Sequence, residues 1–426
     1  MRHVVIGAGP AGVVAAESLR KLDPDSAVVM LSGEPEPPYS RMAIPYYLSE
    51  QVEESGTWLR KRDGYFADKG IDVRTGCWVE SVDTAGKKVL LDSGEVVDYD
   101  RLLIASGAHP IVPPLPGIDR EGVHTCWTLE DARAITGRAK SGSSVVLIGA
   151  GFIGCIVLES LVERKTRLTV VEQQNRMVPR MMDERSGGLI KKWCENKGVS
   201  VHVSTKVESV EGQTGSHPLG VTLDNGECVG ADLVIVCVGV AANIGFLEGT
   251  DIRTDEGILV DRHLQTSVKD VYAAGDVAQG LDFNTGEYTV QAIQPTAADH
   301  GRIAASNMAG RIHRHQGSVN MNVLDTLGLI STSFGMWMGV DGGDSAELYD
   351  PEGFRYVNLQ FKDDILVGAS SLGMTEHVGV LRGLIQGKVR LNGWKEKLRE
   401  DPTRVMEAYL ANTQAIGYNA RVLRPS

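Results

Sequence analysis

Two glycine-rich stretches carry the clearest chemical signal in this chain. In GAGPAG, Gly7, Gly9 and Gly12 stand at GxGxxG spacing directly after the apolar run Val4–Ile6. The first glycine of such a loop permits a tight turn, the second lets backbone amides approach a pyrophosphate, and the third lets a helix pack close to the strand. The following helix directs unpaired N–H groups and a positive dipole at the phosphates. The stretch therefore predicts a dinucleotide site.

An acidic residue follows the next predicted strand, as such a site requires. Residues 27–31 form an apolar run, and Glu34 comes just after it, where a carboxylate binds ribose hydroxyls. Arg41 lies in the proline- and aromatic-rich turn that follows, before a short predicted helix. It is either a clamp on a pyrophosphate or a solvated loop arginine.

The same pattern returns at residue 144. SVVLIGAGFIG places Gly149, Gly151 and Gly154 between a predicted strand and a helix, and the next strand ends at Glu172. A carboxylate there should accept hydrogen bonds from the adenosine 2′- and 3′-hydroxyls and repel a 2′-phosphate. Arg176 is the basic residue that follows most closely. NADH is therefore favoured over NADPH.

Small residues end several later apolar strands, where a cofactor could approach the backbone. They are Ala105-Ser106-Gly107 and Gly239. Gly275 and Asp276 follow another short strand, and the Asp276 carboxylate could bind sugar hydroxyls, cap a helix, or do both.

The six cysteines offer no metal site. They are scattered, and the closest pair, Cys228 and Cys237, is nine residues apart. Such spacing provides no zinc or iron–sulfur ligand set and suits a reducing compartment. Cys237 lies in an apolar run and is interpreted as a core residue. Any metal centre that this protein serves would belong to another protein.

Composition bounds the remaining possibilities. The chain has 426 residues and a formal net charge of −12, so we expect several domains and no nucleic-acid partner. No stretch approaches the ~20 apolar residues of a membrane helix. The first strand begins at about residue 3, which leaves no room for a targeting peptide. We expect a cytoplasmic protein without membrane insertion.

The pattern of elements predicts an α/β fold. Residues 71–99 read as a small meander of short strands, 199–210 and 219–223 as further strands, and 296–310 as a helix rich in small residues. From about residue 320 strands and helices continue without a glycine fingerprint, which indicates a third, α+β domain. The tail from residue 393 reads as helical in part.

With these residues in place, the chain resembles the FAD-dependent pyridine nucleotide-disulfide oxidoreductases, in the group of rubredoxin and ferredoxin reductases, NADH oxidases and nitrite reductase flavin segments. The motifs GAGPAG, EPEPPYSR, YDRLLIASG, GAGFIG, VCVGVAAN and TSVKDVYAAGDVA occur in the group's order. The resemblance implies two Rossmann-like domains, for FAD and for NADH, and a C-terminal α+β interface domain that usually forms a homodimer. The implied ranges are 1–112 and 243–320 for FAD, 113–242 for NAD(P)H, and 321–426 for the interface.

The resemblance also assigns cofactor-binding positions. Val79 would lie near the adenine of FAD. The positions expected to bind cofactor are Gly7, Gly9, Pro10, Ala11, Gly12, Glu34, Arg41, Val79, Ala105, Ser106, Gly107, Gly149, Gly151, Phe152, Ile153, Gly154, Glu172, Gly239, Gly275 and Asp276.

The departures from the group bear on chemistry. Met42 stands at about the place of the redox cysteine, and a thioether cannot ionise or attack sulfur. Tyr46 and Ile156 stand near the places of a lysine and a glutamate that pair beside the flavin in many electron-transfer reductases. Glu159, one helical turn on, could substitute only in part, since a turn displaces it by ~5 Å. Trp127 replaces an FAD-contacting arginine.

These features predict no catalytic side chain and a simple role. Hydride passes between NADH and the flavin, and electrons pass to or from a separate redox protein, plausibly iron–sulfur. The alternatives are an NADH oxidase that reduces oxygen, and a flavoprotein subunit with a structural role in a larger redox complex. His300 and His377 are interpreted as packing or surface residues before proton donors.

Overall fold

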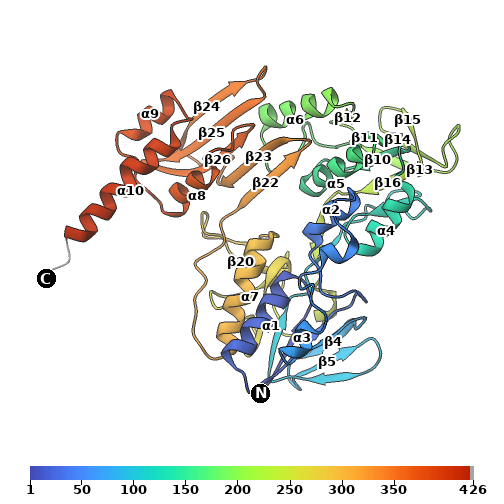
Figure 1. Ribbon diagram of the computed structural model, residues 1–426, viewed down its shortest axis with the longest axis vertical. Coiled ribbons are helices and arrows are strands. Elements are labelled where there is room, and N and C mark those ends of the chain that lie inside the picture. The colour runs from blue at the N-terminus through green and yellow to red at the C-terminus, as the bar shows by residue number, and fades with distance from the viewer. Residues whose placement is uncertain (423–426) are drawn as a thin grey trace.

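The computed structural model describes the backbone of residues 1–422 and the side chains of residues 1–413. It has three parts (Figure 1). The N-terminal lobe contains the first glycine loop, the inserted lobe contains the second, and the C-terminal unit begins at β22. The expected fold class, two Rossmann-like α/β lobes with an α+β unit, is confirmed. The exact domain boundaries stay a prediction.

A five-stranded parallel sheet organises the N-terminal lobe. Its strand order is β19-β7-β1-β2-β3, and the central strand β1 is buried from His3 to Ile6. Val5 pairs with Met30 on one side and Leu103 on the other. The strands are β1 (Arg2–Ile6), β2 (Ala27–Leu31), β3 (Ile71–Arg74), β7 (Arg101–Ile104) and β19 (Val271–Ala273).

Two helices from opposite ends of the lobe's sequence pack together on this sheet. They are α1 (Pro10–Leu22) and α7 (Gln294–Met308), drawn in front of the sheet in Figure 1. A Cβ on Gly301 would lie 2.4 Å from the backbone oxygen of Ala11, so only glycine allows the helices to approach this closely. The helix expected over the small-residue stretch is confirmed.

The meander expected over 71–99 is confirmed only in its second part. An antiparallel sheet is formed by β4 (Val79–Asp83), β5 (Lys88–Leu91) and β6 (Val96–Asp98). Assigning 71–74 to it was wrong, because β3 pairs in parallel with β2 and buries Ile71 beside Val28.

The remaining elements of this lobe are short. They are η1 (Arg41–Ala43), α2 (Ile44–Leu48), η2 (Glu54–Thr57), α3 (Tyr65–Asp68), β8 (Ala108–Pro110), β17 (Val240–Ala242), η3 (Gly245–Leu247), β18 (Ile258–Leu259), η4 (Gly275–Val277), β20 (Ala278–Leu281) and β21 (Tyr288–Val290). Strands β8 and β17 pair where the chain leaves and re-enters the lobe.

The inserted lobe repeats the parallel arrangement, with strand order β12-β11-β10-β16-β9. The stretch 199–210 divides between this sheet and a second, antiparallel one, because the chain leaves the parallel sheet after His202. The elements are β9 (Val123–Thr125), α4 (Leu129–Arg138), β10 (Ser144–Ile148), α5 (Phe152–Glu163), β11 (Arg167–Val171), α6 (Glu184–Asn196), β12 (Ser200–His202), β13 (Val207–Glu211), β14 (Leu219–Leu223), β15 (Cys228–Ala231) and β16 (Leu233–Val236).

Two arginines of the inserted lobe bind the loop of the N-terminal lobe that follows Glu34. Arg133 on α4 contacts Glu54 at 2.7 Å and Glu36 at 2.8 Å. Arg164, just after α5, donates to the carbonyl of Leu48 at 2.8 Å. These contacts fix the segment that carries Arg41 between the two lobes.

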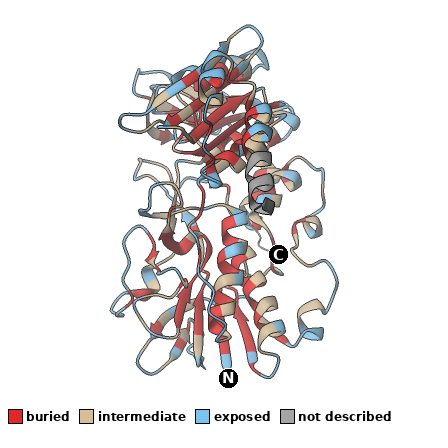
Figure 2. Cartoon of the chain, turned by 90° about the vertical axis from the view of Figure 1, so that its left-hand side faces the viewer, coloured by how far each residue is buried: buried red, intermediate tan, exposed pale blue. Residues whose placement is uncertain are grey.

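The C-terminal unit is an antiparallel sheet in the order β22-β23-β26-β25-β24. One face packs on helices, and Figure 2 shows the buried residues of its strands in red. The elements are β22 (Met321–Thr326), β23 (Leu329–Gly335), β24 (Asp344–Asp350), β25 (Arg355–Lys362), β26 (Ile365–Leu372), α8 (Val378–Gln386), α9 (Trp394–Glu400) and α10 (Val405–Val422). Within residues 1–422, no helix has the length and apolar character needed to cross a membrane.

The C-terminal unit joins the inserted lobe through an apolar contact. Leu324 and Tyr356 belong to the same buried cluster as Leu158 of α5. The Tyr356 hydroxyl donates to Asp183 at the start of α6. Through these contacts β22 lies beside α5, close to the space between the lobes.

Two buried histidines predict how stability depends on pH. His300 on α7 packs edge-on against His315, with ring centroids 4.7 Å apart, and burial lowers the pKa of His300 to about 3. In the unfolded chain this histidine takes up a proton below about pH 6.5, whereas in the folded protein it does not until much lower pH. Its contribution to stability is therefore full above pH ~6.5 and falls as pH drops, by up to about 1.4 kcal/mol per pH unit.

We expect a His300→Gln variant to show a flatter decline of unfolding free energy between pH 7 and pH 5 (~2 pH units) than the wild type, measured by urea denaturation. His263→Gln, at a partly exposed position, is the control and should keep the wild-type slope. An unchanged slope in His300→Gln would contradict this assignment.

Candidate functional site

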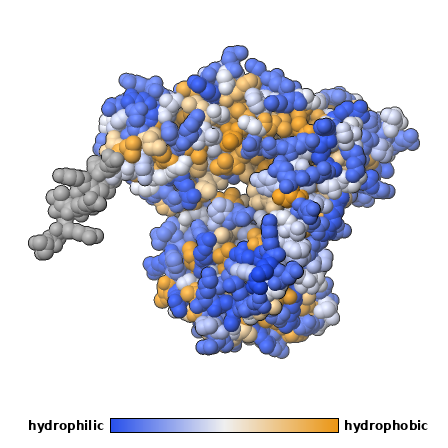
Figure 3. All heavy atoms as spheres, in the orientation of Figure 1, coloured by the Kyte–Doolittle hydropathy of each residue, from blue (hydrophilic) through white to orange (hydrophobic). Residues whose placement is uncertain are grey.

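A cavity of about 1480 Å³ lies between the two lobes, in the hollow at the centre of Figure 3. Its volume exceeds the ~300–1,000 Å³ of pockets for drug-sized ligands. Eighteen of the twenty expected cofactor positions line it, and Gly12 and Gly154 lie beneath its surface. The lining positions are Gly7, Gly9, Pro10, Ala11, Glu34, Arg41, Val79, Ala105, Ser106, Gly107, Gly149, Gly151, Phe152, Ile153, Glu172, Gly239, Gly275 and Asp276.

The first glycine loop has the geometry of a phosphate cradle. Gly7 has a φ of +107°, and a Cβ there would lie 2.1 Å from the oxygen of Ala105. A Cβ on Gly12 would lie 1.9 Å from the oxygen of Gly7, whereas a Cβ on Gly9 would meet nothing within 4 Å. Gly9 is the N-cap of α1, so a side chain there would fill the space in front of the helix N-terminus. These residues fit a pyrophosphate such as that of FAD.

The second loop repeats this geometry. A Cβ on Gly149 would lie 2.5 Å from the oxygen of Cys237, and one on Gly154 would lie 2.2 Å from the oxygen of Gly149. A Cβ on Gly151, the N-cap of α5, would meet nothing within 4 Å. The inserted lobe therefore offers a second dinucleotide cradle on the same cavity.

Glu172 is buried beside the second loop, where its carboxylate accepts two backbone N–H groups. One comes from Ala150 and one from Gln174, each at 2.8 Å. The carboxylate thus fixes the glycine loop as well as lining the cavity. Arg176 donates to the carbonyls of Met182 and Pro179 and to the side chain of Asn175, so its guanidinium is committed to its own loop.

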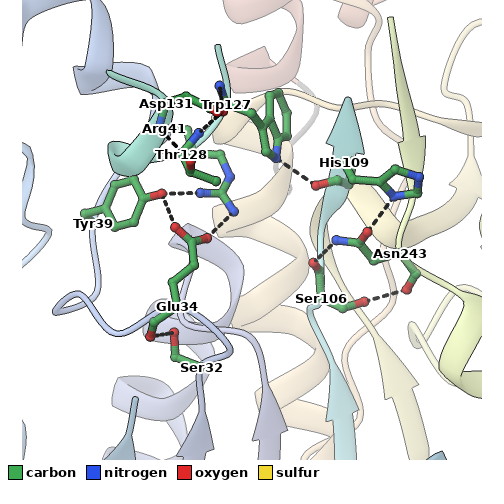
Figure 4. A network of polar contacts seen from close by, with 11 residues as sticks. Ser32, Glu34, Tyr39, Arg41, Ser106, His109, Trp127, Thr128, Asp131 and Asn243 are labelled. Atoms are coloured by element: carbon green, nitrogen blue, oxygen red, sulfur yellow. Dashed lines mark hydrogen bonds and ion pairs between the residues drawn. The ribbon is translucent and has the colours of Figure 1, made fainter. Parts of the chain in front are cut away.

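On the first lobe, Glu34, Tyr39 and Arg41 form a hydrogen-bonded group of three (Figure 4). Arg41 donates to Glu34 at 2.7 Å and to the Tyr39 hydroxyl at 2.5 Å, and that hydroxyl donates to Glu34 at 2.5 Å. Burial raises the pKa of Tyr39, so the phenol stays a neutral donor. Arg41 is therefore a cavity residue with defined partners and not a solvated loop arginine.

Trp127 covers the opposite side of Arg41. The guanidinium lies 5.4 Å from the indole ring, within the range of a cation–π contact, and the indole N–H donates to the carbonyl of Ala108 at 2.8 Å. The backbone before α4 is fixed by Asp131, which accepts from the N–H of Trp127.

Asp276 faces the cavity and has no hydrogen-bond partner within the part of the chain that the structure describes. It lies in η4 beyond the N-cap Ala274, and it makes no cap hydrogen bond. Burial raises the pKa of its carboxyl group, and the charge of Arg41 opposes that rise. A carboxylate without a protein partner at this position is suited to accept sugar or ribityl hydroxyls.

The crossover between lobes is fixed by a pair of polar residues. Ser106 donates through Oγ to the carbonyl of Asn243 at 2.9 Å, and Asn243 Nδ2 returns a hydrogen bond to the carbonyl of Ser106 at 2.8 Å. His109 Nδ1 lies 2.6 Å from Asn243 Oδ1. Figure 4 shows these side chains at the ends of neighbouring strands.

Of the positions that depart from the reductase pattern, some line the cavity and others do not. Met42 and Ile156 line it, whereas Tyr46 is 54% exposed and does not. Glu159 does not line it either: burial raises the pKa of its carboxyl group, as do the charges of Asp325 and Glu163. The structure does not support even a partial substitution by Glu159, because Glu159 lies outside the cavity lining.

Three cysteines line the cavity, and Cys77 is the one at its rim, where its Sγ donates to the carbonyl of Thr75 at 3.4 Å. The other two, Cys126 and Cys237, are poor nucleophiles, because burial raises the pKa of Cys237 to about 12 and that of Cys126 well above its usual value. His300 and His377 lie outside the cavity lining. Among residues 1–413, no three His, Cys, Asp or Glu side chains are grouped to hold a metal ion.

Several cavity residues escaped prediction from sequence. Tyr39, Asn243, Trp78, Arg180 and Lys206 line the cavity. Asn243 is 137 residues from its partner Ser106, and no sequence spacing announces such a pair. Trp78 could have been noticed in the sequence, because it is a large aromatic residue directly before Val79 and at the start of a predicted strand.

Known proteins place this site in a family. The sequence profile of the pyridine nucleotide-disulphide oxidoreductases matches residues 1–301. The chain is 28% identical over 415 residues to the NADH-dependent phenylglyoxylate dehydrogenase subunit epsilon of Aromatoleum evansii, covering 97% of this chain and 98% of that protein. It is 32% identical to rhodocoxin reductase of Rhodococcus erythropolis, over 73% and 72% of the two chains.

A solved structure agrees with these relatives. An NAD-dependent persulfide reductase from A. fulgidus superposes with a TM-score of 0.84 at 27% identity, over 92% of this chain and 78% of that one. The two glycine cradles on one cavity and the profile match over 301 residues lead to one conclusion. The chain belongs to the pyridine nucleotide-disulphide oxidoreductase family and is an oxidoreductase that uses FAD and NAD(H).

Proposed function

We propose that this protein passes electrons between NAD(H) and a separate one-electron carrier, an iron–sulfur protein or an iron–sulfur subunit of a larger oxidoreductase. One observation carries the proposal: two dinucleotide cradles share a cavity that Met42 lines, at about the place where the family resemblance implies a redox cysteine. FAD, when bound, supplies the exchange between hydride transfer and single-electron transfer. The protein supplies binding, alignment and shielding from water.

The FAD-binding residues in this proposal belong to the N-terminal lobe. The first glycine loop holds the pyrophosphate, and Arg41 turns from Glu34 toward it. Glu34 binds the ribose hydroxyls, and Asp276 accepts from the ribityl chain. Ser106 and Gly107 let the backbone approach the ring system.

NADH is assigned to the inserted lobe. Gly149, Gly151, Phe152 and Ile153 cradle its pyrophosphate, and Gly239 lets the backbone approach. Glu172 disfavours a 2′-phosphate, and Arg176 is already committed to its own loop. These features support a preference for NADH over NADPH.

The relative from Aromatoleum evansii, a named subunit that matches over nearly its whole length, supports a role within a larger assembly. The proposal covers both directions of electron flow, reduction of the partner by NADH and reduction of NAD+ by the partner. A homodimer formed through the C-terminal unit and a cytoplasmic location are further parts of the proposal, and analytical ultracentrifugation would test the first.

Reoxidation kinetics test the proposal. The protein is reduced anaerobically with NADH and then mixed with air-saturated buffer or with oxidised [2Fe–2S] ferredoxin, and tagged protein is isolated from its own cells to identify bound redox proteins. We expect slow reoxidation by air and an iron–sulfur protein in the isolate that reoxidises the flavin faster. Fast turnover with air, and no faster reaction with any isolated carrier, would identify an NADH oxidase instead. Tight NADH binding without flavin reduction would instead favour a flavoprotein subunit with a structural role.

A further inference from the structure

Trp78 lies on the rim of the interlobe cavity, in the loop between β3 and β4. Its side chain is 58% exposed and lines the cavity with Val79 and Glu34. The loop is fixed to the turn after β2: the N–H of Cys77 donates to Ser32 at 2.8 Å, and that of Gly76 donates to Glu34 at 3.0 Å. An indole of this size is therefore held at a defined place beside Glu34.

Gly33 lies against the indole ring of Trp78. A Cβ on Gly33 would lie 2.5–2.7 Å from three carbon atoms of the Trp78 ring. The ring therefore lies directly over the Cα of Gly33, and a side chain at position 33 would push it away. Because Trp78 is nevertheless 58% exposed, we infer that the ring face turned away from Gly33 is available to a flat partner.

The position of Glu34 indicates what that partner is. The acid at the end of the second strand of a dinucleotide-binding unit marks the ribose, and the pyrophosphate lies toward Gly9. The base attached to that ribose extends away from the glycine loop, past Glu34. Trp78 and Val79 are on this side, because their loop is hydrogen-bonded to the residues around Glu34. A purine stacks on an indole face whatever its edge groups are.

We propose that Trp78 binds the adenine of FAD by stacking, with Gly33 as the support behind the indole. The inference rests on the FAD site proposed above and deepens it. It makes Trp78 a binding residue for the AMP half of the cofactor, remote from the flavin ring. Recognition by stacking requires no hydrogen bond to the adenine edge.

The test compares side chains that keep or lose the ring. FAD affinity of the apoprotein is measured by fluorescence titration for Trp78→Ala, Trp78→Leu and Trp78→Phe. Base stacking is worth about 1–3 kcal/mol, so Ala and Leu should raise the FAD Kd by roughly 5- to 150-fold. Phe should restore most of the affinity. The Kd for FMN, which lacks the AMP half, should not change in any variant.

Tyr288→Ala is the matched control, because Tyr288 is 45% exposed in the same lobe and lies outside the cavity lining. It should leave the FAD Kd unchanged. An unaltered FAD Kd in Trp78→Ala, or an equal loss in Ala, Leu and Phe, would overturn the assignment. Failure of the wild-type protein to bind FAD would instead refute the site itself, so the two failures are distinguishable.

Discussion

A Gly9→Val variant should fold like the wild type and yet purify without FAD. Gly9 has φ −74° and ψ −176°, an extended conformation that any residue adopts, and a Cβ there meets nothing within 4 Å. The added methyl groups instead occupy the space in front of the α1 N-terminus. Losing two hydrogen bonds to charged phosphate, at about 1.5–3 kcal/mol each, should raise the FAD Kd by more than about 100-fold.

Visible absorbance of the purified protein and thermal unfolding of the apoprotein check this expectation. The informative contrast is Gly12→Val, whose Cβ would lie 1.9 Å from the Gly7 oxygen and should destabilise the fold itself. Full flavin content in Gly9→Val would show that the pyrophosphate does not lie in front of this loop.

A Gly151→Val variant should keep FAD and lose its reaction with NADH. Gly151 has φ −76° and ψ −168°, again extended, and its Cβ would also enter open space in the cavity. By the same reasoning the Kd for NADH should rise by more than about 100-fold. Flavin content should equal that of the wild type, because the FAD cradle lies on the other lobe.

The measurement is the rate of flavin bleaching as a function of NADH concentration under anaerobic conditions. Ser144→Ala, in the same lobe at the start of β10, serves as the control and should bleach at the wild-type rate. Loss of FAD from Gly151→Val would contradict the assignment of one cofactor to each lobe.

Much of the fold could be predicted because local pattern and tertiary role coincide. The Rossmann strands are short, apolar and followed by glycines whose φ values or close contacts admit no side chain, as at Gly7 and Gly149. Local sequence could not show that β3 would leave the meander, since strand pairing depends on a partner about 40 residues earlier. Local sequence also could not show that residues 199–210 form two strands, because β12 and β13 are distinguished by the sheets in which they pair.

The candidate site divides in the same way. Residues that act through their own backbone or at the end of their own strand, such as Gly9 and Glu172, were found from spacing. Residues that act through a distant partner were not. Asn243 is positioned by its hydrogen bond to Ser106. The place of the Trp78 ring requires that position 33 carry no side chain. The displacement of Glu159 by one helical turn was visible in the sequence, and the structure adds that Glu159 lies outside the cavity lining.

An anaerobic titration of the FAD-loaded protein with NADH, followed by visible absorbance, tests most directly whether the two cradles serve one reaction. We predict that about one equivalent of NADH per FAD bleaches the flavin, and that NADPH does so only at much higher concentration because of Glu172. A protein that binds both cofactors but keeps its flavin fully oxidised would contradict the claim that the two cradles serve one reaction.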